Sequence, residues 1–119
     1  MSKQIRVIVC RVGQHPVVEQ IDAGLDGMQA IVGGYIECVQ LSGTLESGVD
    51  LWLNEEGRIN GMPLNRLVKD DRGRNWDVFG DVFISRHDDE GETIGLTDED
   101  VAKWLPRLKD APVSIFNIP

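Results

Sequence analysis

The sequence lacks long apolar runs and any surplus of basic residues. No apolar stretch approaches the roughly 20 residues that a transmembrane helix needs, and the N-terminus carries no signal-peptide pattern. We therefore expect a cytoplasmic protein that does not associate with a membrane. The chain has 12 Lys and Arg against 20 Asp and Glu, a net charge of -8. Because this charge would repel a phosphate backbone, direct nucleic-acid binding is not expected.

Cysteine and histidine are scarce, with two of each in 119 residues. Cys10 and Cys38 lie in expected strands without the short spacings of a zinc site, so we expect buried free thiols. His15 lies in a turn and His87 in an acidic loop, and both are expected at the surface. Nearby carboxylates should raise the pKa of His87. The sequence thus predicts no catalytic residues, no metal and no cofactor, and it favours a protein that is not an enzyme.

Runs of β-branched and apolar residues predict most of the secondary structure. Turns are expected at residues 54–57 and 70–75, and a bend at residues 61–66, where Pro63 restricts the backbone. Gly80 lies inside the last long run, where it predicts a bulge or a close contact. The expected strands cover residues 5–11, 17–21, 35–41, 49–53, 58–60 and 76–85.

Two segments have the apolar spacing of helices. The first follows Asp22, a potential N-cap, and ends at the glycine pair Gly33–Gly34. The second begins at Thr97, with Asp100 at the capping-box position. Pro106 should kink or end this second helix because it has no backbone N–H.

This order of elements predicts an α+β domain. We expect a single, mostly antiparallel sheet of about five to six strands with two helices, one after the second strand and one near the C-terminus. The domain should span residues 1–110. Residues 111–119 form an apolar tail that could cover the body or a second copy, so a homodimer is a further expectation.

Acidic residues are concentrated in the C-terminal half. Residues 87–100 contain seven acids and no Lys or Arg. One hypothesis is therefore an acidic protein–protein module that occupies a nucleic-acid-binding partner. The alternative is solvated acids, of which Asp98, Glu99 and Asp100 would stabilise the start of the second helix.

The segment NEEGRINGMPLNR, residues 54–66, contains the best candidates for a binding site. Arginine forks suit phosphates or carboxylates, and asparagine amides can both donate and accept. The alternative is that the asparagines satisfy turn backbones while the arginines pair with nearby acids. The predicted ligand-binding residues, gathered in one cleft, are Tyr35, Trp52, Asn54, Arg58, Asn60, Asn65, Arg66 and Asp77.

The stretches IVGGYIECVQL (31–41), NEEGRINGMPLNR (54–66) and WDVFGDVFIS (76–85) resemble a family of small phage-, plasmid- and bacterium-borne proteins. This family is domain of unknown function 3846, and the resemblance covers residues 4–108. It implies a mobile-element context, and for a phage-encoded chain the host cytoplasm. There, small non-enzymatic proteins often modulate host systems.

From the site and this resemblance together, we expect a non-enzymatic module that holds a small polar, nucleotide-like ligand and modulates a host defence system. A host protein is the alternative partner. A small hydrolase is the least favoured alternative, because no credible general base is present.

Overall fold

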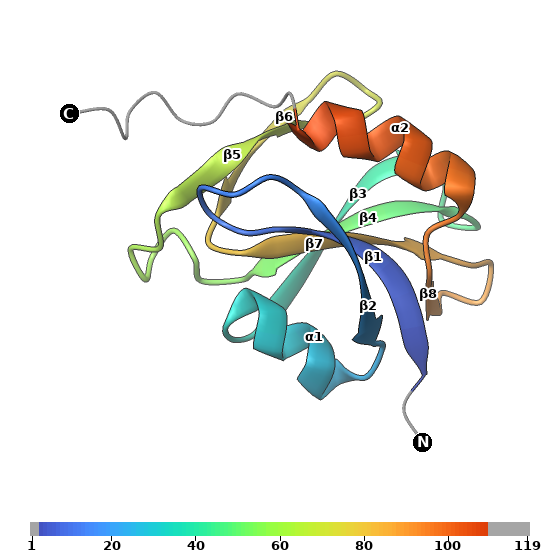
Figure 1. Cartoon of the computed structure of the whole chain (residues 1–119), viewed down its shortest axis with the longest axis horizontal. Helices are drawn as coiled ribbons and strands as arrows, with labels where there is room; N and C mark the ends of the chain where they lie inside the picture. The colour runs from blue at the N-terminus through green and yellow to red at the C-terminus, as the bar shows by residue number, and fades with distance from the viewer. Residues whose placement is uncertain (1–2, 110–119) are drawn as a thin grey trace.

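The computed structural model describes residues 3–109, which form an α+β fold built on one central antiparallel sheet (Figure 1). The strand order is β2-β1-β7-β4-β3, with the short β8 paired to β7, and β5 and β6 form a separate hairpin. The predicted fold class is confirmed. The elements are β1 (Gln4–Cys10), β2 (Val17–Asp22), α1 (Leu25–Val32), β3 (Ile36–Gly43), β4 (Gly48–Asn54), β5 (Leu64–Lys69), β6 (Asn75–Phe79), β7 (Val82–His87), β8 (Thr93–Ile94) and α2 (Asp98–Lys109).

The central sheet has a hydrophobic core on each face. On one face, α1 contributes Met28 and Val32 to a cluster that includes Phe83 of β7. On the other face, α2 and the β5–β6 hairpin cover the sheet, and Trp104 and Leu108 lie in that cluster. The two helices thus lie on opposite sides of the sheet (Figure 1). Among the residues described, no helix is both long enough and apolar enough to cross a membrane.

The expected single strand over residues 76–85 is wrong, because the chain changes sheets within it. β6 belongs to the hairpin and β7 to the central sheet. Between them, Gly80 adopts a left-handed conformation with φ of 74°, and its N–H donates to the Pro63 carbonyl at 2.8 Å. A Cβ on Gly80 would lie 2.7 Å from the Met62 sulfur, so the expected close contact is confirmed.

The segment between β4 and β5 also differs from the prediction. Residues 58–60 are not a strand, because residues 55–61 form consecutive turns closed by local bonds such as Asn60 N–H to the Glu56 carbonyl at 2.8 Å. The expected bend at residues 61–66 holds only as far as Pro63, after which β5 begins. The short strand β8 was not expected.

The first helix begins later than predicted and ends where expected. The Asp22 carboxylate accepts the N–H of Gly24 at 2.8 Å, and Gly24 itself is the N-cap, without a side-chain cap. A Cβ on Gly27 would lie 2.7 Å from the Asp22 carbonyl oxygen, so glycine allows the helix to approach β2 closely. Gly33 ends the helix with φ of 78°.

The second helix has the predicted capping box. The Asp100 carboxylate accepts the Thr97 N–H at 2.9 Å, and the Thr97 hydroxyl accepts the Asp100 N–H at 3.1 Å. Pro106 does not end the helix, which continues to Lys109. The expected tail of residues 111–119 lies outside the described residues.

Candidate functional site

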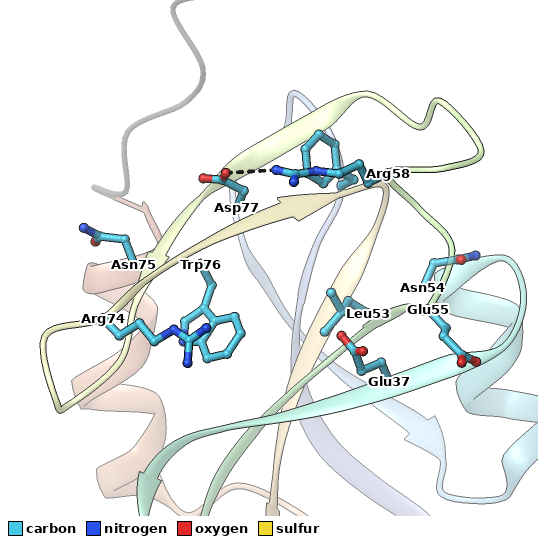
Figure 2. A pocket seen from close by; sticks show the side chains of 10 residues that line it. Glu37, Leu53, Asn54, Glu55, Arg58, Arg74, Asn75, Trp76 and Asp77 are labelled. Carbon is cyan, nitrogen blue, oxygen red and sulfur yellow. Dashed lines mark hydrogen bonds and ion pairs between the residues drawn. The ribbon is translucent and has the colours of Figure 1, made fainter.

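Three of the eight predicted site residues line one groove, formed where β6 crosses near β3 and β4 (Figure 2). They are Asn54, Arg58 and Asp77. The cavity has a volume of about 340 Å³. The remaining lining residues come from β3, β4 and β6 or the turns beside them: Glu37, Leu53, Glu55, Arg74, Asn75, Trp76 and Phe79.

Arg58 crosses one wall of this groove. Its guanidinium donates to the Asp77 carboxylate at 3.2 Å, and the two side chains are 72% and 50% exposed. The guanidinium carbon also lies 5.1 Å from the centre of the Phe79 ring. Because an exposed ion pair contributes little net energy, Asp77 restrains the Arg58 side chain only weakly.

Arg74 also lines the groove, and it lies with Trp76 on the face of β6 opposite to the Arg58–Asp77 pair (Figure 2). The Arg74 guanidinium carbon lies 4.0 Å from the centre of the Trp76 ring. The Trp76 indole N–H donates to the Asp70 carboxylate at 3.0 Å, and Asp70 also accepts the N–H groups of Arg72 and Arg74. These hydrogen bonds, that from Trp76 first, lower the pKa of Asp70. The turn is therefore held rigidly below an exposed guanidinium.

The sequence does not single out Arg74 and Trp76 as site residues, because residues 70–75 have the composition of a polar turn and Trp76 begins an expected strand. A signal was present. The two residues are two apart at the start of a strand, and such residues project from the same face of a sheet. An arginine beside a tryptophan on one face is a typical cation–π arrangement.

Asn65 and Arg66 do not reach the groove, which corrects their predicted place in one cleft. Their exposed fractions are 1% and 2%. The Asn65 amide donates to two carbonyls, those of Cys10 and Gly80, both at 2.8 Å. The Arg66 guanidinium donates to the Leu108 carbonyl at 2.7 Å and to the Asn65 side-chain oxygen at 2.8 Å. Both residues therefore satisfy buried backbone groups.

Three other predicted residues also lie away from the groove. Trp52 belongs to the α1-side core, where its ring stacks on Phe83 at 6.2 Å between centroids and its N–H donates to Ser85. Tyr35 is 70% exposed, and Asn60 is exposed in the turns after β4. The structure therefore does not gather the eight residues into one cleft.

Asn54 lines the groove, but its amide is used internally. Its nitrogen donates to the Val32 carbonyl at 3.1 Å, and its oxygen accepts the Glu56 N–H at 2.8 Å. Asn54 is 7% exposed. It therefore connects the end of α1 to the turn after β4, with its amide oxygen and one amide N–H used within the fold.

His87 is less exposed than expected. Its side chain is 14% exposed, and its Nδ1 lies 2.6 Å from the Asp50 carboxylate, while Nε2 lies 2.8 Å from the Thr44 carbonyl. Burial disfavours the charged ring, but the hydrogen bonds to Asp50 and Thr44 outweigh it and raise the pKa of His87. The direction of the predicted shift is confirmed, although its source is a buried partner rather than the acidic loop.

Several acids of the 87–100 stretch have structural partners. Asp88 accepts the N–H groups of Glu90 and Glu92, both at 2.9 Å. Asp98 pairs with Arg6, and Asp100 pairs with Arg86. These three acids thus have roles within the fold, although Asp98 is still 93% exposed.

The thiols and acids provide little else for chemistry. Cys10 is buried as expected, but Cys38 is exposed, and both are free. Burial raises the pKa of Cys10 to about 11. Partial desolvation of the Cys38 thiol, together with the nearby carboxylates of Asp50 and Glu37, raises its pKa to about 12, so neither thiol ionises readily. Within residues 3–109, no three His, Cys, Asp or Glu side chains form a potential metal site.

Comparison with known proteins gives one family. A family model described as "Domain of unknown function (DUF3846)" matches residues 5–109. Comparisons with curated proteins and with solved structures gave no match. The matched range contains the whole groove and nearly all of the described fold.

Proposed function

The chain belongs to the DUF3846 family, whose description assigns no function, and from that premise we propose that it is a non-enzymatic binding module. Its ligand is a small, polar, anionic molecule held in the groove between Arg58 and Arg74. The observation that carries this proposal is the placement of two exposed guanidinium groups on one groove of a protein with net charge -8.

The two guanidinium groups suit different parts of a nucleotide-like ligand. Arg58 has an exposed and weak partner in Asp77, so a phosphate can take the place of that carboxylate in charge-assisted hydrogen bonds. Arg74 lies against Trp76 with one face, and its other face can stack on a planar base. A nucleotide supplies both a phosphate and a planar group.

The groove favours binding over reaction. Its lining consists of arginine, amide, carboxylate, aromatic and leucine side chains, which offer charge and hydrogen bonds to a ligand. The mobile-element context implied by the family resemblance directs the choice of probes. We propose that the ligand is a nucleotide signal of the host, and that its sequestration would modulate host defence.

Isothermal titration against a panel of nucleotides and cyclic nucleotides tests this function. We expect heat with at least one of them, and a loss of affinity of about tenfold or more in Arg58→Ala and in Arg74→Ala, because each removes a charge-assisted contact. Lys69→Ala is the matched control, since Lys69 is exposed and does not line the groove. The proposal fails if no nucleotide gives heat, or if the control loses as much affinity as the two arginine variants.

A further inference from the structure

We propose that the outer edge of β3 binds an extended, acidic segment of a partner protein by adding it to the central sheet as a further strand. This interaction goes beyond the ligand groove. It uses backbone groups of β3 and the cations of the turn between β5 and β6.

The backbone of β3 has hydrogen-bonding groups that face away from the sheet. β3 is an end strand with only β4 beside it. The Tyr35 carbonyl accepts the Glu55 N–H from the β4 side at 2.9 Å. Because the facing of backbone groups alternates along a strand, Glu37 also faces β4, and the N–H and C=O of Ile36 and Cys38 face outward.

One backbone carbonyl on this edge of β3 already accepts a hydrogen bond from another segment of the chain. The Asp71 N–H donates to the Leu41 carbonyl at 2.9 Å, so the turn between β5 and β6 contacts the end of β3 as a neighbouring strand would. Within residues 3–109, the outward backbone groups of Ile36 and Cys38 have no backbone partner. The open part of the edge therefore extends from Ile36 to just before Leu41.

A second cavity, of about 390 Å³, runs beside this open edge. It adjoins the ligand groove, because Arg74 and Trp76 line both. Its wall opposite β3 contains Asp70, whose carboxylate is already used by the Trp76 N–H and by two backbone N–H groups. The β3 side consists of Cys38, Val39 and Gln40.

The positive charge of two arginines in this cavity indicates an acidic partner segment. Arg72 and Arg74 both line it, and among the described residues neither forms an ion pair with a carboxylate, in contrast to Arg58, Arg86 and Arg107. Strand addition places alternate side chains of the added segment on the same face of the sheet. A segment with an acid at every second position can therefore present carboxylates to these two arginines.

The opposite edge of the sheet provides an internal comparison. On β2, the Ala23 N–H donates to the Lys3 carbonyl at 2.8 Å, so by the same alternation the backbone groups of Gln20 face outward. The neighbouring cation Arg11 is already paired with Glu19. The β2 edge thus has open backbone groups beside a paired arginine, and β2 itself contains the acids Glu19 and Asp22, so it should bind an acidic strand more weakly than β3 does.

The test uses a fluorescein-labelled peptide in which Glu alternates with Thr. Its length of about eight residues lies within the usual range of a β-strand. Binding is measured by fluorescence anisotropy on the full chain. Cys38→Pro removes an outward N–H, and Gln20→Pro makes the matched change on β2. Proline is tolerated at such edge positions, and circular dichroism verifies that both variants fold. Arg72→Ala tests the charge.

We expect the peptide to bind the wild type and Gln20→Pro equally, at least tenfold more weakly to Cys38→Pro, and several-fold more weakly to Arg72→Ala. Peptide binding should also protect the Cys38 amide from hydrogen exchange. The proposal is overturned if the peptide does not bind, if Cys38→Pro binds as the wild type does, or if Gln20→Pro is equally impaired. Dimerisation that Cys38→Pro abolishes, without peptide binding, would identify a second copy as the occupant and also overturn it.

The failure of this inference can be told apart from failure of the ligand site. Cys38 and Arg72 do not line the ligand groove, so Cys38→Pro and Arg72→Ala should keep the nucleotide heat of the wild type. Loss of peptide binding with intact nucleotide binding therefore concerns only the β3 edge.

Discussion

Arg58 and Arg66 come from one short segment and have opposite environments. Arg58 has a side chain that is 72% exposed, whereas Arg66 is 2% exposed. The Arg66 guanidinium donates to carbonyls of Gln14 and Leu108, both at 2.7 Å. It thereby connects β5 to the turn after β1 and to the end of α2. Arg66 is a structural residue, and Arg58 is available to a ligand.

Replacing Arg66 should therefore affect stability rather than binding alone. Arg66→Ala leaves the buried contact at the Leu108 carbonyl and the part-buried contact at the Gln14 carbonyl without their donor. It also opens a cavity, so we expect a loss of about 2–4 kcal/mol in the free energy of unfolding. Arg58→Ala should change it by less than about 0.5 kcal/mol, because the residue is exposed. Urea unfolding of both variants gives the comparison, and equal stability would contradict this assignment.

His87 has two hydrogen-bond partners that favour its charged form. The Thr44 carbonyl can only accept, so Nε2 must donate to it. Nδ1 lies 2.6 Å from the Asp50 side chain, and when Asp50 is ionised Nδ1 donates to it as well, so that the ring is an imidazolium. Burial raises the pKa of Asp50 more than the His87 hydrogen bond lowers it, and the pair remains together because both side chains are largely enclosed.

The raised pKa of His87 predicts a pH dependence of stability. The folded pKa lies above the unfolded value of about 6.5, so the stabilisation is fully present below pH 6.5 and is lost as the pH rises through the folded pKa. We expect the free energy of unfolding of the wild type to fall from about pH 6.5 upward. His87→Gln should show a flatter profile in urea unfolding, and a profile as steep as that of the wild type would refute the role of His87.

At the residue scale, the sequence predicts the chemical groups that a site could contain better than it predicts where each residue lies in the fold. Arg58 and Asp77 line the groove, and their side chains are 72% and 50% exposed, whereas their role in ligand binding stays a prediction. The predicted placement failed for Asn65 and Arg66 because their burial depends on carbonyls from distant segments, such as Leu108. Residue types alone do not show such tertiary contacts.

At the scale of elements, Gly80 determines how the β5–β6 hairpin is attached to the sheet. Its left-handed backbone lets the chain leave β6 and enter β7 in the other sheet. The side chain of Met62 fills the space where a Cβ would lie. A substitution there meets both an unfavourable backbone conformation and a steric contact.

Gly80→Ala should therefore cost more than Gly73→Ala. Both glycines have positive φ, 74° and 85°, but a Cβ on Gly73 would have nothing within 4 Å. We expect a loss of about 1 kcal/mol for Gly73→Ala from the backbone alone, and of about 2–3 kcal/mol for Gly80→Ala. Chemical denaturation measures both. Equal losses in the free energy of unfolding would show that the contact with Met62 does not destabilise Gly80→Ala.

Periodicity located most elements because each strand and helix buries one consistent face. It could not divide residues 76–85, because apolar residues continue through Gly80 and either one strand or two satisfies the same pattern. The strand β5 was missed for a related reason. Its polar residues Asn65 and Arg66 are buried, so the burial pattern no longer follows polarity.

At the scale of the whole molecule, the two cores share the strands of one sheet. Neighbouring residues of β7 illustrate this, since Phe83 belongs to the α1-side cluster and Ile84 to the α2-side cluster. Neither core can lose its packing without disturbing strands that the other core needs. The expected single domain should therefore unfold as one cooperative unit.

Tryptophan emission can test this cooperativity one face at a time. Trp52 packs against the α1-side cluster, whereas Trp76 and Trp104 belong to the α2 side. Trp52→Phe leaves reporters only on the α2 side, and the double variant Trp76→Phe/Trp104→Phe leaves one only on the α1 side. Within each variant, we expect emission and far-ultraviolet circular dichroism to give the same urea midpoint, even where the substitution lowers stability. If Trp52 emission changed at lower urea than the circular dichroism of the same variant, the α1 side would unfold separately, and the sheet would not couple its two faces.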